Sequence, residues 1–416
     1  MVGFRVVQGI GGGMIMPLTM SMVYRMVPRR KIGLALGVWG IAALAAPAVG
    51  PTIGGYMVDF LNWRLIYTIN IPIGIIAIIL CSIYIEETPV HHHLKFDFNG
   101  FVLSAVGLFC LLLALSEGAD RGWMSGYILS LFAVALFTLT YFVVHELRTD
   151  DPMLDLRLLK NRTFTGSIII TSVTSIAMFG GVFLVPLYMQ TFRGFTAMQT
   201  GELMMPAGLA TGLIMPFSGR LYDKIGAKPL VVIGLTVLGL ATLLFHNLSM
   251  ETAYGTIMLW LIFRSVGLGI CMMPATNAGM SVVPTKLVGR ASSLNNVIRQ
   301  VSSSFGVAII TTLLTQRQTF HQAAGASAVT PDSYQAVSAI NLLQNMMLRA
   351  GLGLAQAKGG ALALFNGMLM QQAFVQAVED VFLLLAVVAF LGLIPVFMLK
   401  RQKHDDSAPV RVDPGH

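Results

Sequence analysis

Charged side chains are scarce in this sequence. Asp, Glu, Lys and Arg make up 11% of the 416 residues, whereas 55% are hydrophobic and the mean hydropathy is +0.75. Soluble domains carry roughly 25% charged residues, so this chain has too few charges to cover a water-exposed surface. Apolar stretches recur along nearly the whole length, and many reach the roughly 20 residues that a membrane-spanning helix needs. The composition therefore predicts an all-α, polytopic membrane helix bundle.

Cysteine is also rare. Cys81, Cys110 and Cys271 lie far apart in apolar segments and form no C-x-x-C pair, so we interpret them as small buried hydrophobic residues. The histidine triplet His91–His93 is weak evidence for a metal site. Within the spans we find no cluster of His, Asp or Ser of the kind a membrane enzyme needs. The sequence therefore predicts no metal, no cofactor and no enzymatic activity.

Hydropathy predicts eleven membrane spans separated mostly by short polar loops. Two loops are longer: the charged stretch 145–162, and the segment 316–378, which is rich in Ala, Gln, Ser and Gly. The predicted spans are 1–22, 32–57, 65–85, 98–116, 127–145, 163–190, 200–218, 229–247, 254–282, 289–315 and 379–399.

The net charge of +8 would suggest nucleic-acid binding in a soluble protein, but here the positive-inside rule explains it more simply. Of the 27 Lys and Arg residues, 18 fall in loops on one side of the predicted spans and 6 on the other. Arg5, Arg264 and Arg299 lie inside spans. We therefore predict no nucleic-acid partner, a cytoplasmic C-terminus and an external segment 316–378. We expect that segment to form an amphipathic helix lying on or above the bilayer.

The stretch "RVVQGIGGGMIMP" at 5–17 resembles a nucleotide loop only superficially. A G-x-G-x-x-G fingerprint needs a third glycine where Met14 stands and a preceding strand, and both are missing. On a helix, Arg5, Gln8, Gly9 and Gly13 share one face. The two glycines would let another helix approach closely, and a cation at membrane depth usually faces a cavity or a carboxylate.

Three motifs at this end of the chain carry a resemblance to a known family. "RVVQGIGGG" is similar to the fourth-helix motif R-x-x-Q-G-x-G of the major facilitator superfamily. The run Gly50-Pro51-Thr52-Ile53-Gly54-Gly55 resembles the fifth-helix antiporter motif G-P-x-x-G-G. "NWRLIYTINIPIG", at 62–74, resembles a signature of the fourteen-helix drug:proton antiporter branch, and the additional spans at 98–145 fit that branch.

Two further motifs lie in the second half of the chain. "GRLYDKIGAK" resembles the superfamily's cytoplasmic gate loop, in which Asp223 would cap a helix beside basic partners. Its motif residues here are Gly219, Arg220, Asp223, Lys224, Gly226 and Lys228. "FRSVGLGICMMP", with Arg264, Gly267 and Gly269, repeats the pattern of the opening stretch and predicts helix packing.

A polar cluster in the span 289–315 contains Asn295, Asn296, Arg299 and Gln300. These side chains would either line a cavity or form hydrogen bonds between helices. The sequence alone leaves both interpretations open.

The resemblance implies proton-coupled export of small amphipathic compounds across the cytoplasmic membrane by alternating access. In that mechanism Arg5 and Gln8, with Asn295 and Arg299, would serve proton coupling or line the cavity. The expected partners are a small-molecule substrate, protons, the lipid bilayer and a periplasmic adaptor protein.

The same resemblance divides the chain into four parts. Residues 1–85 would be the remainder of an N-terminal helix bundle, and 86–162 a linker with two extra spans. Residues 163–400 would form a C-terminal six-helix bundle containing the external segment 316–378, and 401–416 a cytoplasmic tail.

The match begins at the family's fourth helix. We therefore expect the first three helices to be missing from a truncated gene product. The alternative is a remnant that does not transport, or a membrane scaffold. An importer and a membrane-embedded enzyme are further alternatives, against which the antiporter motif and the lack of clustered catalytic residues argue.

Overall fold

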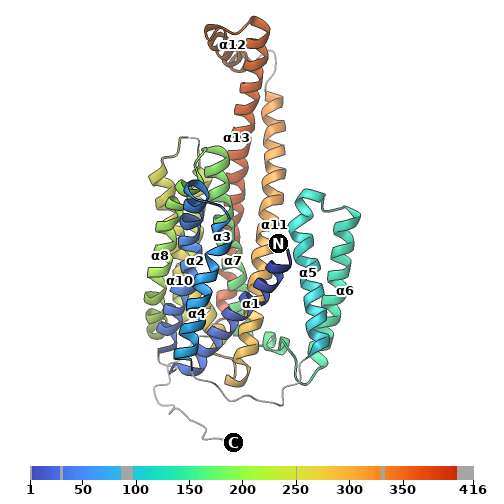
Figure 1. Cartoon of the computed structure of the whole chain (residues 1–416), viewed down its shortest axis with the longest axis vertical. Helices are drawn as coiled ribbons and strands as arrows, with labels where there is room; N and C mark the ends of the chain where they lie inside the picture. Colours follow the sequence, from blue (N-terminus) through green and yellow to red (C-terminus); the bar gives the residue numbers. More distant parts are fainter. Residues whose placement is uncertain (1, 29–30, 86–96, 250, 329–332, 401–416) are drawn as a thin grey trace, which may run out of the picture.

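The computed structural model describes residues 2–28, 31–85, 97–249, 251–328 and 333–400, and every regular element within these ranges is a helix (Figure 1). His91–His93 and the predicted tail 401–416 lie outside the described residues. Among the described residues, nine helices are long and apolar enough to cross a membrane. Helices α2 and α8, each of 29 residues, also exceed the length that a bilayer requires. The chain is a polytopic helical bundle, as its composition predicts.

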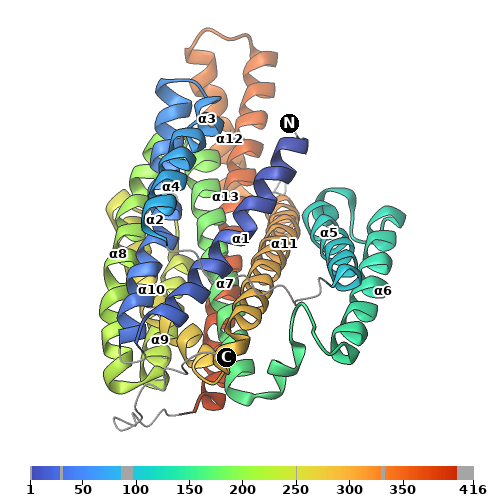
Figure 2. The same cartoon turned by 60° about the horizontal axis from the view of Figure 1, so that its bottom comes forward.

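The first four helices lie along one side of the bundle (Figures 1 and 2). They are α1 (Val2–Met26), α2 (Ile32–Phe60), the single turn α3 (Leu65–Thr68) and α4 (Asn70–Tyr84). No residue of α4 is buried, and its isoleucine-rich surface suits contact with lipid. Helix α1 is attached toward its C-terminal end, where Tyr24 donates a 2.9 Å hydrogen bond to Asn277 Oδ1 and Trp39 Nε1 donates to Thr19 Oγ1 at 3.0 Å.

Helices α5 (Phe98–Arg121) and α6 (Gly126–Arg148) form a hairpin that stands beside the bundle (Figures 1 and 2). Gly122, with a φ of 82°, makes the turn between them. Asp97 caps α5 and Ser125 caps α6 through their side-chain oxygens. The hairpin touches the bundle beside its turn, where Trp123 Nε1 donates to Thr312 Oγ1 at 3.0 Å.

The next four helices contribute a large part of the buried core of the bundle. They are α7 (Arg162–Leu187), α8 (Ala197–Ile225), α9 (Ala227–Leu244) and α10 (Tyr254–Met280). Short 3-10 turns at Leu156–Lys160, Phe245–Asn247 and Thr285–Leu287 and a π-turn at Tyr188–Phe192 flank them. The contact between α10 and α9 leaves no room for a side chain at two glycines: a Cβ on Gly267 would lie 2.5 Å from Leu238 N, and one on Gly234 would lie 2.7 Å from Cys271 N.

The last helices differ from the prediction. Helix α11 (Val288–Ala328) runs 13 residues beyond the predicted span end at 315, and α13 (Leu354–Leu391) begins 25 residues before the predicted start at 379. At 1.5 Å per residue each is about 60 Å long, twice the hydrocarbon thickness. Their outer parts, with α12 (Tyr334–Arg349), form a stalk that rises from the bundle (Figure 1). A last 3-10 turn, Ile394–Met398, follows α13.

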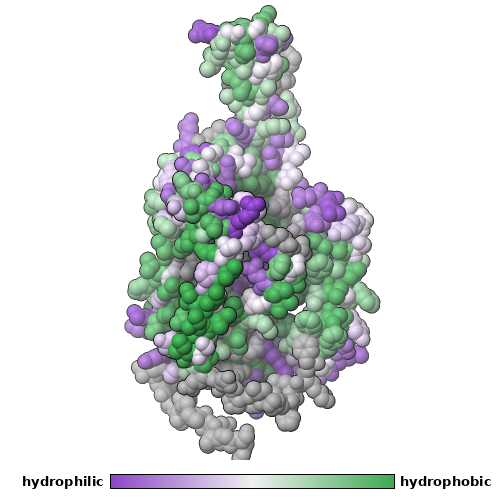
Figure 3. Space-filling model, viewed as in Figure 1, coloured by the Kyte–Doolittle hydropathy of each residue, from purple (hydrophilic) through white to green (hydrophobic). Residues whose placement is uncertain are grey.

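The described residues of segment 316–378 are therefore mostly helical, but they belong to three helices rather than to one helix lying along the bilayer. Its base is tied together by Asp380 of α13, whose Oδ2 accepts from Arg317 Nε at 2.7 Å and from His321 Nε2 at 2.6 Å. Figure 3 shows apolar side chains over the body of the bundle and a mixture of polar and apolar side chains on the stalk.

Candidate functional site

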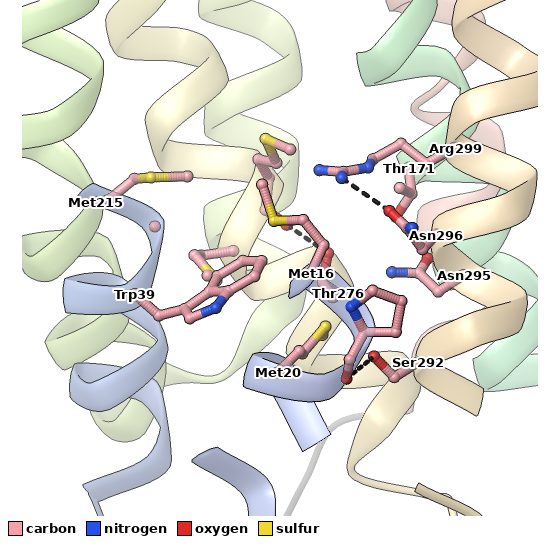
Figure 4. A pocket seen from close by; sticks show the side chains of 14 residues that line it. Met16, Met20, Trp39, Thr171, Met215, Thr276, Ser292, Asn295, Asn296 and Arg299 are labelled. Atoms are coloured by element: carbon pink, nitrogen blue, oxygen red, sulfur yellow. Dashed lines mark hydrogen bonds between the residues drawn. The ribbon is translucent and has the colours of Figure 1, made fainter. Parts of the chain in front are cut away.

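A first pocket lies where α1 and α2 meet α7, α8, α10 and α11 (Figure 4). It encloses about 540 Å³ of space between atoms, which includes space open to solvent. Six helices contribute to its lining, so helices of the first and second halves of the chain form it together. A change in how the two halves pack would therefore change its shape.

One wall of the first pocket is polar and belongs to α11. Asn295, Asn296 and Arg299 all line it, and Arg299 Nη2 donates to Asn296 Oδ1 at 2.9 Å (Figure 4). Asn295 is buried, and its Oδ1 has no hydrogen-bond partner. A buried carbonyl oxygen without a partner is costly, so this wall offers an acceptor to a molecule that enters the pocket.

The opposite wall is apolar and flexible. It is made by Met16 and Met20 of α1, Trp39 of α2, Met215 of α8 and Met272 of α10. Methionine side chains adapt to irregular shapes, and an indole ring gives a flat apolar surface. The wall of α1 is fixed to α11 by Ser292 Oγ, which donates to the carbonyl oxygen of Pro17 at 3.2 Å. The pocket thus combines a polar wall with an apolar wall whose methionine side chains can adapt.

A second pocket of about 620 Å³ lies between α7, α8 and α10. Met272 lines both pockets and so stands between them. The second pocket contains Arg264, whose side chain is 3% exposed. Arg264 Nη2 donates to the carbonyl oxygen of Ala177, while Nε has no hydrogen-bond partner. A Cβ on Gly181 would collide with the guanidinium, so the absence of a side chain there makes room for it.

Arg5 and Gln8 lie elsewhere. Both are exposed on α1, where Arg5 Nη1 donates to Gln8 Oε1 at 2.8 Å and the guanidinium lies 4.8 Å from the ring centre of Tyr67. Neither side chain lines either of the two pockets. A Cβ added to Gly9 or Gly13 would meet no atom within 4 Å, so no described residue packs closely against this glycine face.

The antiporter-like motif lies on the seam between α2 and α8. Thr52 Oγ1 donates to the carbonyl oxygen of Gly201 at 2.9 Å. A Cβ on Gly55 would lie 2.6 Å from the backbone of Ala197, and one on Gly201 would lie 2.7 Å from Pro51 O. Gly50 and Gly54, in contrast, have no neighbour within 4 Å of an added Cβ. Gly55 thus lies in the tight contact, while its two motif partners face open space.

The gate-like loop is a tight helix-to-helix turn. Helix α8 continues through Ile225, and Gly226, with a φ of 82°, ends α8 and begins α9. Asp223 lies in the last turn of α8 and is not the N-cap residue of α9, because Gly226 takes up the left-handed backbone that stops α8 and begins α9. Gly219 is buried, Arg220 and Lys224 are exposed, and Asp223 and Lys228 are half-buried.

The glycines after Arg264 contact two different helices. Gly267 packs against the backbone of α9, whereas a Cβ on Gly269 would lie 2.5 Å from Ile214 Cγ2 of α8. This close packing brings α8 and α9 against α10 in the turns that follow Arg264.

Some residues of the pockets were not singled out from the sequence. Thr171 and Thr276 add hydroxyl groups to the first pocket, and Thr211 and Ser265 add them to the second. Single hydroxyl residues in apolar spans are too common to mark a site. Only the pairing of the helices shows that they line a cavity.

Comparison with known proteins places these features in a family. The family model described as Major Facilitator Superfamily matches residues 1–307. The chain is 34% identical over 404 residues to the uncharacterized MFS-type transporter YhcA of Bacillus subtilis, covering 96% of this chain and 76% of YhcA. It is 31% identical over 314 residues to the lincomycin resistance protein LmrB of Listeria innocua, covering 76% and 67%. It is 30% identical over 409 residues to the fatty acid resistance protein FarB of Neisseria gonorrhoeae, covering 96% and 78%.

Proposed function

This chain belongs to the major facilitator superfamily, a family of membrane transporters, and we propose that it exports small amphipathic compounds from the cytoplasm in exchange for protons. Relatives named for resistance to lincomycin and to fatty acids support export rather than uptake. The two compound classes differ in structure but share an amphipathic character, which suits a broadly selective site.

The observation that carries this proposal is the first pocket. It joins helices from both halves of the chain and sets a polar α11 wall against methionines and Trp39. A flexible apolar wall binds many shapes with modest selectivity. The partnerless amide oxygen of Asn295 would orient the polar end of the substrate.

Alternating access would follow from sliding at the seam between α2 and α8. The backbones of the two helices approach each other closely at both ends of the seam. An added Cβ on Gly37 would lie 2.8 Å from Pro216 Cα, and one on Gly55 would lie 2.6 Å from Ala197 C. Smooth glycine surfaces let two helices shift without side chains locking them. In the proposal, Pro51 and Gly55 control this packing in the conformation described, whereas Gly50 and Gly54 face open space.

The turn between α8 and α9 would serve as the cytoplasmic gate. In the proposal Asp223 pairs with basic neighbours in one state and releases them in the other, while Gly219 and Gly226 permit the tight turn. The basic neighbours are Arg220, Lys224 and Lys228. The C-terminus would lie on the same, cytoplasmic side of the inner membrane.

Proton coupling remains part of the proposal. Arg5 with Gln8 and Arg299 with Asn296 are two guanidinium groups hydrogen-bonded to amides. Neither arginine forms an ion pair within the described residues, so each is available to a carboxylate during the cycle. The stalk, which projects beyond the bundle, would contact a periplasmic adaptor protein. We retain residues 1–85, 86–162 and 163–400 as the proposed structural divisions.

Transport by purified protein tests the proposal. The full chain is reconstituted into liposomes that contain ethidium, and dye movement is followed by fluorescence under an imposed pH gradient. We expect gradient-dependent dye movement that nigericin abolishes. Asn295→Ala should slow it at least threefold, because the polar wall loses its acceptor.

The matched control is Asn341→Ala, which makes the same change on the exposed surface of α12, outside the pocket. It should transport at the rate of the unchanged protein. Dye movement that is indifferent to nigericin would contradict antiport, and no dye movement at all would contradict export of this class of compound.

A further inference from the structure

The guanidinium of Arg264 lies deep in the membrane part of the bundle. Arg264 follows Tyr254, the first residue of α10, by ten positions, which places it about 15 Å along the helix axis. This is half the hydrocarbon thickness of a bilayer. Water is therefore a poor source of solvation for this charge.

The described residues supply only part of the hydrogen bonds and none of the opposite charge that this guanidinium needs. Arg264 donates one hydrogen bond to a neutral carbonyl oxygen, its Nε has no partner, and it forms no ion pair within the described residues. The linings of the two pockets include no carboxylate. A buried cation normally has an anionic partner because its desolvation is otherwise uncompensated.

The space beside Arg264 is shaped for an apolar chain. Met178 and Val182 of α7, Met204 of α8, and Leu261, Leu268 and Met272 of α10 line it. Ser265 and Thr211 are the hydroxyl residues in this lining, and Thr211 Oγ1 already faces the carbonyl oxygens of Ala207 and Ser265, each at 3.2 Å. The pocket therefore pairs a single cation with a mostly hydrocarbon surface.

We propose that the second pocket binds a single-chain amphiphile with a carboxylate head, which pairs with Arg264 while its hydrocarbon tail lies along the methionine and leucine side chains. A carboxylate matches the planar fork of a guanidinium and balances its single charge. A phosphate dianion would leave an excess negative charge, since the lining offers no second cation. The binding site itself does not depend on the proposed function. Only the further statement that this amphiphile is a transport substrate rests on the proposed function.

Binding measurements test the assignment without requiring transport. The purified full chain is placed in phosphatidylcholine nanodiscs and titrated with the fluorescent fatty acid cis-parinaric acid and, separately, with its methyl ester, each against protein-free discs. We expect the unchanged protein to bind the acid at least tenfold more tightly than the ester. Because the comparison uses the unchanged protein, it decides the proposal even if substitutions at Arg264 prevent folding.

Two substitutions separate charge from packing. Arg264→Gln should bring the affinity for the acid down to that for the ester, whereas Arg264→Lys should retain most of the preference. The matched control is Arg121→Gln, on the exposed end of α5 where Arg121 pairs with Glu117 at 2.8 Å, and it should keep the full preference.

Three results would overturn the assignment. These are equal affinity for acid and ester in the unchanged protein, a preference that survives Arg264→Gln, and displacement of the acid by phosphatidylglycerol with the same dependence on Arg264. The last would make the pocket a phospholipid site. Acid binding without dye transport would contradict the proposed function alone, and dye transport without acid binding would contradict this assignment alone.

Discussion

At the scale of single residues, Asp97 links the two helices of the side hairpin. Its Oδ1 accepts from the backbone N–H of Gly100 and from His145 Nε2, both at 2.9 Å. Burial by itself would raise the pKa of Asp97, but these hydrogen bonds and the nearby imidazole together hold that pKa below its ordinary value. The ionised carboxylate is thus the form that stabilises the hairpin.

The depressed pKa of Asp97 predicts a pH-dependent loss of stability. Its contribution is fully present above the ordinary pKa of 3.8 and disappears as the pH falls through the lower folded value. Asp97→Ala should therefore cost about 1–2 kcal/mol at pH 7 and progressively less toward pH 3. Thermal unfolding of the detergent-solubilised protein across this range measures the effect.

Ser125→Ala provides the control for this prediction. Ser125 caps the other hairpin helix with a hydroxyl that does not titrate. Its substitution should lower stability by a similar amount at every pH. Parallel pH profiles for the two variants would contradict the role of the Asp97 charge.

Residue types alone predicted part of the candidate site. Asn295 and Arg299 stand four positions apart on a helix, and polar side chains in an apolar span either line a cavity or form hydrogen bonds to another helix. The structure brings both into the first pocket. Arg264 was expected only in a packing motif, and its pocket depends on the absence of a side chain at Gly181 on another helix. No pattern local to Arg264 contains that information.

At the scale of elements, the α2–α8 seam distinguishes neighbouring glycines. We expect Gly55→Ala to cost about 1–3 kcal/mol, because its Cβ would meet the backbone of Ala197, which cannot rotate away. Gly54→Ala should cost nothing measurable, since its Cβ would enter open space. Thermal unfolding of the two variants in the same detergent is the measurement, and equal midpoints would contradict the packing described for the seam.

Helix boundaries were predicted well where hydropathy changes and poorly where it does not. Span 254–282 closely matches α10, whereas α11 continues past 315 through polar residues such as Gln316, Arg317 and Gln318. Hydropathy marks the edge of a membrane, but Ala- and Gln-rich sequence remains helical in water when another helix packs beside it. The contacts of Asp380 with α11 supply that packing, and they join residues about 60 positions apart.

At the scale of the whole molecule, the charge distribution predicts which side each end of the bundle faces. In a variant whose three cysteines are replaced, Tyr334→Cys on the stalk should react with a membrane-impermeant maleimide in intact spheroplasts. Lys400→Cys should react only after the membrane is permeabilised. Tyr334 is 86% exposed and Lys400 is also exposed, so accessibility within the protein is not limiting. The opposite labelling pattern would contradict the predicted orientation.

The all-helical membrane class followed directly from the shortage of charge, but the arrangement of helices did not. Apolar spans resemble one another in composition. Which spans pack together depends on where small residues such as Gly55, Gly201 and Gly234 allow two helix backbones to come into contact. Such matches join positions far apart in the chain. They are visible only when both surfaces are known.

Helix α11 has a mechanical consequence. It carries Asn295 and Arg299 of the first pocket near one end and reaches Ala328 in the stalk at the other, without interruption. A rigid rod about 60 Å long that tilts by about 10° at its inner end moves its outer end through about 10 Å. A small displacement beside a bound molecule is thereby magnified into a large swing outside the membrane, where a pair of spin labels could detect it.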